Sequence, residues 1–240
     1  MIKEPFLTNN FKGFPAESLN FLKQLENNNN RDWFKKHKNE YSQLILTPAQ
    51  LFVADLGEKL QKLSPKIQFD LRTNGSGSIL RIHRDIRFSK DKSPYHTYVR
   101  ILFWEGSLKK MKNSGIFISI DKNGAQIYVG QYGFDPAQLR IFREAVVDDY
   151  FGALLEQAIN NVKSSGNYEI GGEHYKRVPK GYNLNHIRAQ YLKFNSLYSK
   201  SRIITPEILQ DPAFIDTCFE EIKNMMPIHQ WLVSIWKQQF

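Results

Sequence analysis

The chain is poor in cysteine and lacks long apolar runs. Its single cysteine, Cys218, excludes an internal disulfide and a zinc cluster built on cysteine ligands, and is typical of the reducing cytoplasm. No segment approaches the roughly 20 uninterrupted apolar residues of a membrane-spanning helix. The first residues include Lys3 and Glu4 and no stretch typical of a signal peptide. We therefore expect a cytoplasmic protein with no membrane partner.

Acidic residues are fewer than basic ones: 24 Asp and Glu stand against 33 Lys and Arg, for a formal charge of +9. A surface of this charge attracts phosphate-bearing partners, although enzymes with small anionic substrates can share it. Apolar residues make up 41% of the 240-residue chain and aromatic residues 13%. This composition excludes a disordered chain and suffices for a large core.

Apolar periodicity divides the chain into regions of different secondary structure. We expect an irregular arm over 1–13, a helical layer over 14–64, a sheet region over 67–132 and a mostly helical region over 135–240. No repeat or linker separates these regions. They predict a single α+β domain, with a mostly antiparallel central sheet and helical layers from both ends of the chain.

Individual elements can be placed within these regions. The turn signal Asn123-Gly124 favours a tight hairpin, because Asn-Gly readily adopts positive φ angles. Short segments rich in Ile, Val, Phe and Tyr predict strands at 68–72, 79–83, 98–104, 115–121 and 125–131. Helical spacing predicts helices at 15–26, 31–46, 47–63, from 135, at 150–162 and from 214.

Two familiar motifs are incomplete. His83-Arg84-Asp85 resembles the start of a protein-kinase catalytic loop, but Lys90 replaces the metal-binding Asn and no Asp-Phe-Gly follows. Gly75-Ser76-Gly77-Ser78 matches half of a dinucleotide-binding fingerprint, but Leu80 stands where the third glycine belongs. Neither a kinase nor a dinucleotide-binding protein is indicated.

The six histidines show no spacing typical of zinc ligands. His83 and His96, with Asp85, are the one candidate metal set, and a divalent cation there would compete with the surrounding Arg and Lys. We expect no metal and no cofactor.

The segment 81–97 is the strongest candidate for a site, because its cations outnumber its carboxylates, Asp85 and Asp91. In a functional interpretation, arginine forks, lysines and hydroxyls bind a phosphate or carboxylate, and Pro94 stiffens the turn. In a structural interpretation, the arginines pair with the two aspartates. We favour anion binding, because charge in excess of its partners is often used at sites. The cations are Arg81, Arg84, Arg87, Lys90 and Lys92.

Nucleic-acid binding is a third interpretation of this segment. Aromatic residues interleave with its cations, as base stacking combined with backbone neutralisation requires. They are Phe88, Tyr95, Tyr98 and Trp104.

Three motifs carry a resemblance to a known family: Asn-Asn-Arg-Asp-Trp-Phe at 29–34, Arg-Asp-Ile-Arg-Phe-Ser-Lys-Asp-Lys-Ser-Pro-Tyr at 84–95, and Lys-Arg-Val-Pro-Lys-Gly-Tyr at 176–182. Over residues 14–225 the chain resembles the bacterial and fungal family called domain of unknown function 2461. The resemblance implies a single-domain protein without an established activity. The family tends to carry a lysine where this chain has His96, which weakens any role for a cation beside Tyr95. We hypothesise that the two basic motifs and the Trp33 helix converge on one pocket.

The sequence thus predicts a site for a small anionic or phosphorylated ligand. The alternative is a non-catalytic module that binds nucleic acid or protein through the same basic surface. If the protein is an enzyme, Asp85 or Tyr95 is the expected acid or base, because a cationic field stabilises their ionised forms. The sequence selects neither a reaction nor an oligomeric state. The predicted ligand-binding residues are Arg84, Arg87, Ser89, Lys90, Lys92, Ser93, Tyr95, Arg177 and Lys180.

Overall fold

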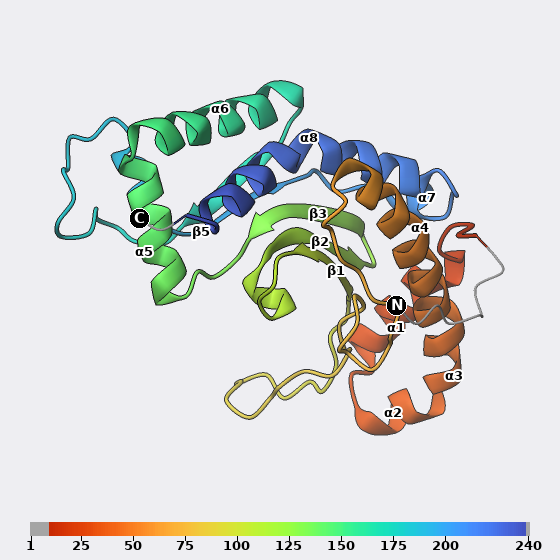
Figure 1. Ribbon diagram of the computed structural model, residues 1–240. Coiled ribbons are helices and arrows are strands. Elements are labelled where there is room, and N and C mark those ends of the chain that lie inside the picture. The colour runs from red at the N-terminus through yellow and green to blue at the C-terminus, as the bar shows by residue number, and fades with distance from the viewer. Residues whose placement is uncertain (1–9, 239–240) are drawn as a thin grey trace. The chain divides into compact units, whose positions relative to one another are not determined.

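A computed structural model describes residues 10–238 (Figure 1). The predicted arm over 1–13 lies mostly outside the described residues, and residues 10–15 precede the first helix. The helices are α1 (Ala16–Asn27), α2 (Arg31–Lys36), α3 (Lys38–Tyr41), the π-helical turn η1 (Ser42–Leu46), α4 (Thr47–Leu63), the short 3₁₀ turns η2 (Lys110–Lys112) and η3 (Ala189–Lys193), α5 (Pro136–Val147), α6 (Asp149–Ser165), α7 (Pro206–Leu209) and α8 (Phe214–Ile235). The strands are β1 (Val99–Glu105), β2 (Ser114–Asp121), β3 (Gly124–Gln131), β4 (Glu169–Glu173) and β5 (Phe194–Lys200).

These strands form one antiparallel sheet in the order β1-β2-β3-β5-β4, so the prediction of an α+β fold is confirmed. The predicted hairpin joins β2 to β3. Asp121 Oδ1 accepts a hydrogen bond from the Asn123 backbone N–H at 2.7 Å, and Gly124 has a φ of 133°. A Cβ on Gly124 would lie 2.1 Å from the Ile204 carbonyl oxygen, so the turn requires glycine for space as well as for backbone conformation.

Two strand predictions were wrong. Residues 68–72 and 79–83 lie outside the named strands, and the second segment makes only isolated bridges, Ile79 with Ile101 and His83 with Tyr95. Strands β4 and β5 were missed because the region from 135 was expected to be mostly helical. The local strand propensity of this region is low because of Gly171, Gly172 and the serines of β5. The strands are stabilised instead by the antiparallel pairing of β4 with β5.

The helix predicted over 31–46 is interrupted at two points. At His37 the backbone leaves the helical region, and the His37 ring stacks on Trp33 while its Nδ1 lies 2.8 Å from the Trp33 carbonyl oxygen. Further on, Pro48 has no N–H to donate to the Leu44 carbonyl, and the Ser18 hydroxyl donates to that oxygen at 2.7 Å instead. The π-helical turn η1 therefore sits just before a proline whose missing hydrogen bond is replaced by a side chain of α1.

The chain divides into two compact units. The first comprises the described residues up to Phe103, with Phe117–Ile127 and Ile203–Phe219, and the second comprises Trp104–Ile116, Tyr128–Arg202 and the described residues from Glu220. Each has an aromatic core. In the first, the rings of Phe52 and Phe214 stack with centroids 5.0 Å apart; in the second, Phe142 packs edge-on against Trp231 at 5.8 Å. Among residues 10–238, no helix has the length and apolar character needed to cross a membrane.

A buried arginine fixes the end of α5 in the second unit. The Arg188 side chain is 4% exposed; its Nε donates to the Val146 carbonyl at 2.8 Å and its Nη2 to the Asp148 carbonyl at 3.1 Å. Val146 belongs to the last turn of α5, where no backbone N–H is left to bind its carbonyl. The Asp148 carbonyl lies between α5 and α6 and also accepts the Gly152 N–H at 2.9 Å. Glu156 lies 3.4 Å from Nη1 and offsets the buried charge.

We expect Arg188→Ala to lower the free energy of unfolding by about 3 kcal/mol, because buried carbonyls and Glu156 lose a charged partner. Gly152→Ala should act similarly, since its Cβ would lie 2.3 Å from Arg188 Nε. Urea denaturation measures both effects. Arg202→Ala, which removes an exposed arginine, serves as the control and should change stability by less than about 0.5 kcal/mol. Equal stability of Arg188→Ala and this control would contradict the assigned role.

Candidate anion-binding site

The basic segment 81–97 folds back on itself within the first unit. The Arg84 N–H donates to the Pro94 carbonyl at 2.9 Å, and the His96 N–H donates to the Ile82 carbonyl at 2.8 Å. Residues 85–93 therefore form the tip of a narrow loop, drawn in yellow in Figure 1. We call residues 82–96 the basic hairpin.

Both arginines of the basic hairpin pair with aspartates of the same hairpin. Arg84 Nη1 lies 2.5 Å from Asp91 Oδ2 and also donates to the Ser93 carbonyl at 2.9 Å. Arg87 donates two hydrogen bonds to the Asp85 carboxylate, one of 3.0 Å from Nε and one of 2.7 Å from Nη2. The arginines thus adopt the arrangement of the structural interpretation, and the tip holds its own counterions.

These contacts shift the pKa values of both carboxyl groups. Hydrogen bonds from Arg87 lower the pKa of Asp85 to about 2. Hydrogen bonds from Ser93, followed by that from Arg84, lower the pKa of Asp91 to about 2. A carboxylate with so low a pKa is a weak base at neutral pH. The geometry of Asp85 therefore favours a structural role over proton transfer.

Other residues of the hairpin differ widely in exposure. Lys90 and Lys92 are both exposed, and Lys92 Nζ donates to the Ile86 carbonyl at 3.0 Å. Phe88 is 95% exposed, with the Arg87 guanidinium 5.9 Å from its ring. Tyr95 is only 6% exposed. The interleaved aromatic residues thus do not share one exposed surface.

Tyr95 joins the first two sequence motifs. The Asn29 side-chain amide donates to the Tyr95 carbonyl at 2.9 Å, and its Oδ1 accepts from the Tyr95 N–H at 3.0 Å. The Phe34 ring stacks on the Tyr95 ring at 4.2 Å. The motifs at 29–34 and 84–95 therefore meet, whereas the third motif, at 176–182 with Arg177 and Lys180, belongs to the second unit.

Removal of this amide should loosen the basic hairpin. We expect Asn29→Ala to lower the free energy of unfolding by about 1 to 2 kcal/mol, because both backbone groups of Tyr95 lose their partner. Hydrogen exchange of the Tyr95 amide should also become faster, which NMR measures directly. Asn28→Ala removes only an exposed bond to the Gln24 carbonyl and is the matched control. Unchanged exchange in Asn29→Ala would show that another contact holds the hairpin.

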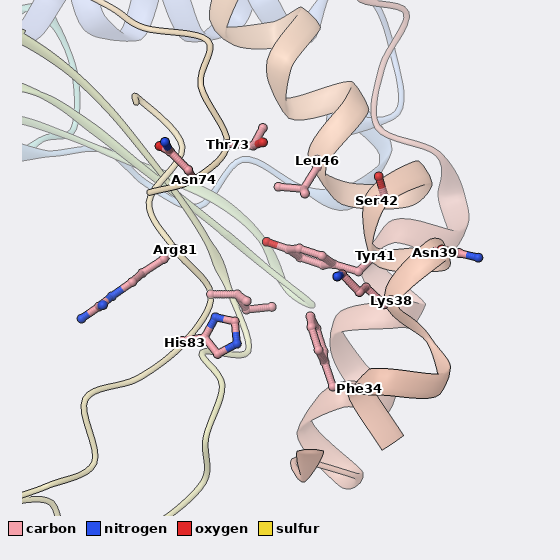
Figure 2. Close-up of a pocket in the computed structure, with 11 residues that line it drawn as sticks. Phe34, Lys38, Asn39, Tyr41, Ser42, Leu46, Thr73, Asn74, Arg81 and His83 are labelled. Atoms are coloured by element: carbon pink, nitrogen blue, oxygen red, sulfur yellow. The ribbon is translucent and has the colours of Figure 1, made fainter. Parts of the chain in front are cut away.

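A cleft of about 390 Å³ opens in the first unit, between the helices from α2 to η1 and the segments at 73–74 and 81–83 (Figure 2). Two fixed cations line it, Lys38 and Arg81, together with His83, and its lining contains no Asp or Glu. The remaining lining residues are Phe34, Asn39, Tyr41, Ser42, Leu46, Thr73, Asn74 and Ile82.

Figure 2 shows the Tyr41 ring extending from the helices toward the wall that carries Arg81 and His83. Burial raises the pKa of Tyr41 to about 12, so its hydroxyl remains a hydrogen-bond donor at neutral pH. The Arg81 guanidinium points away from the helices in the same view. The helical wall thus supplies donors from Lys38 and Tyr41, and a ligand would need the exposed Arg81 side chain to turn toward it.

The cleft uses residues that sequence reasoning assigned elsewhere. None of the predicted ligand-binding residues lines it. Lys38 and Tyr41 lie within the helix predicted over 31–46 and were not predicted to bind a ligand. No local signal distinguishes them, since only the meeting of the helices with residues 73–83 creates the cleft.

Arginines also gather around His96, a short distance along the chain from the cleft wall. Burial, followed by repulsion from Arg100, Arg84 and Arg81, lowers the pKa of His96 to about 4. Arg100 Nη2 donates to the Arg81 carbonyl at 2.9 Å, which ties two of these arginines together. His96 is therefore neutral at pH 7, and the positive field comes from the arginines alone.

The fold and site define an α+β protein with a cation-lined cleft in its first unit. Residues 10–238 contain no group of three or more His, Cys, Asp or Glu able to hold a metal ion. The chain belongs to the family described as conserved hypothetical protein (DUF2461), whose model matches residues 17–231. The resemblance carried by the three motifs is thereby confirmed. No curated protein and no solved structure matches the chain.

We expect the His96 imidazole to titrate near pH 4 in an NMR pH series, well below its usual pKa of 6.5. Between these values the unfolded chain binds more protons than the folded one. The contribution of His96 to stability is therefore complete above about pH 6.5 and declines as the pH falls toward 4.

Arg100→Ala should raise the pKa of His96, because it removes the largest of the three repulsions. Arg202→Ala is the control and should leave this pKa unchanged. An imidazole that titrates near 6.5 in the wild type would refute the arginine cluster around it.

Proposed function

We propose that this protein binds a small anionic ligand, such as a phosphorylated metabolite, in the cleft between α2–η1 and residues 73–83. One observation carries the proposal: Lys38, Arg81 and His83 line the cleft without any carboxylate. An anion that enters would exchange its hydration for cationic and neutral donors, with no acidic group to repel it. The volume also falls within the roughly 300 to 1,000 Å³ of common ligand sites.

The lining of the cleft offers both apolar and polar contacts to such a ligand. Phe34, Leu46 and Ile82 offer apolar contacts. Hydroxyl and amide groups can orient the ligand, among them the protonated Tyr41 and the side chain of Asn74. A ligand with a charged phosphate and a less polar body would match this division.

The tip of the basic hairpin would serve this site from outside the cleft. Arg84 and Arg87 already hold Asp91 and Asp85, so binding a ligand directly would require them to release these partners. Lys90 and Lys92, together with Arg81, add positive potential in the same unit, which raises the local concentration of anions and their association rate. We therefore assign the hairpin a steering role.

The alternative of nucleic-acid binding through the same hairpin has less support. A stacking surface needs several accessible rings, and Tyr95 is buried beneath the Asn29 and Phe34 contacts. Phe88 alone among the hairpin's aromatic residues is highly exposed.

The test is a thermal-shift panel of inorganic phosphate, nucleotides, sugar phosphates and organic acids. We expect at least one phosphorylated compound to raise Tm by about 5 °C or more at about 100 times its dissociation constant. Lys38→Ala should weaken that ligand roughly tenfold or more, because a charge-assisted contact is lost.

Lys36→Ala removes an exposed lysine of α2 that does not line the cleft, and it should bind as the wild type does. Arg87→Ala should slow association at low salt and leave the dissociation rate unchanged. Absence of stabilisation by every anion, or equal stabilisation of wild type and Lys38→Ala, would refute the proposal.

A further inference from the structure

The third sequence motif forms a closed loop on α5 in the second unit. At one end, the Tyr175 ring lies over the Arg143 guanidinium, 5.1 Å from its centroid. At the other, the Tyr182 hydroxyl donates to Glu144 Oε1 at 2.8 Å. Because Arg143 and Glu144 are adjacent, residues 176–181 are held between two anchors on one turn of the helix. Figure 1 shows this pale blue loop next to α5.

The loop and the helix carry cations without counterions. Lys176, Arg177 and Lys180 are exposed, as is Arg140 on α5, and none of them forms an ion pair within residues 10–238. Glu144 already accepts the bond from Tyr182. In the basic hairpin of the first unit, by contrast, both arginines hold an aspartate.

Arg143 adds an unusual feature to this cluster. Its Nε is shielded from solvent and has no hydrogen-bond partner, the sole such side-chain atom in the described part of the chain. A buried donor left without an acceptor costs free energy, so a partner that displaces the shielding groups and supplies an acceptor would be stabilising. The ring of Tyr175 beside it gives the guanidinium a fixed position.

We propose that the loop at 174–182 and the adjoining face of α5 bind single-stranded nucleic acid. Unpaired cations on two elements match a chain of phosphates better than a single phosphate group. Tyr175, 38% exposed, places an aromatic ring among these cations, and unpaired bases stack on such rings. An acidic protein would supply the charge but would leave the ring without a stacking partner.

The hydroxyl of Tyr182 keeps the surface assembled at neutral pH. Burial and the bond to Glu144 raise the pKa of Tyr182 to about 12, against the opposing effect of Arg143 and Arg140. The loop is therefore already closed before any strand binds, which reduces the conformational entropy lost on binding.

The experiment measures fluorescence anisotropy of a labelled oligothymidylate over a series of salt concentrations. For a single strand, the slope of log K against log salt is about −0.7 for each neutralised phosphate. The combined variant Lys176→Ala, Arg177→Ala, Lys180→Ala should lose roughly tenfold or more in affinity, and its slope should be shallower by about 2.

The matched control is Lys23→Ala, Lys62→Ala, Lys66→Ala, which removes the same charge from exposed lysines of the first unit. It should bind within about twofold of the wild type. Tyr175→Ala should weaken binding roughly tenfold with an unchanged salt slope, the signature of stacking rather than charge. Circular dichroism and unfolding curves confirm that each variant is folded.

Three results would overturn the proposal: no binding by the wild type at low salt, equal losses in the loop variant and its control, or competition by polyglutamate as strong as that by oligothymidylate. Lys38→Ala should leave oligonucleotide binding unchanged, and the loop variant should keep the thermal shift produced by the cleft ligand. Failure of one site is therefore distinguishable from failure of the other.

Discussion

The basic hairpin depends on one side chain outside it. Asn29 presents its amide to the backbone of Tyr95 in the way a neighbouring strand would, with bonds of 2.9 and 3.0 Å. A segment rich in like charges has little tendency to pack, and its backbone groups still need partners. This amide and the Phe34 ring stacked on Tyr95 supply the attachment. The wall formed by residues 81–83 takes its place beside the helices as a result, and the cleft exists because that wall is held.

Charge pairing then divides the cations into two groups. Arg84, Arg87 and Arg188 are satisfied by carboxylates or carbonyls, and their contribution is to the fold. Lys38 and Arg81 at the cleft have no acidic neighbour in its lining. The chain has 33 basic and 24 acidic residues, and the excess of basic residues is not spread evenly. The two proposed sites lie where cations have no carboxylate partner.

Local signals explain which parts of the fold the sequence predicts. The Asn123-Gly124 hairpin and the capped start of α5 at Asp135-Pro136 are encoded within a few residues, and both were predicted correctly. Strands β4 and β5 were not, because each depends on a partner strand and contains residues that disfavour strands. The asparagine run 27–30 separates the helices predicted at 15–26 and 31–46, and Asn30 caps the second of them, α2. The bond from Asn29 to Tyr95 spans 66 positions and leaves no local trace.

The proposed cleft draws only part of its lining from the segment singled out in the sequence. Segment 81–97 does contribute Arg81 and His83 to the cleft, but the opposite wall comes from helices whose lysines resemble any solvated face. In the same way, Arg143 has no distinctive sequence context. Its unpartnered Nε and its contact with the Tyr175 ring arise only in the folded chain. A sequence pattern alone therefore does not reveal residues that long-range packing brings together.

The closed loop on α5 has a consequence for variation. Its two anchors, Tyr175 and Tyr182, use contacts that do not involve residues 176–181. The length and composition of the intervening chain can then change while the helix and the anchors stay as they are, since lengthening a loop between fixed ends costs little conformational entropy. A designed peptide grafted between the two tyrosines would therefore be displayed on a support that is already folded.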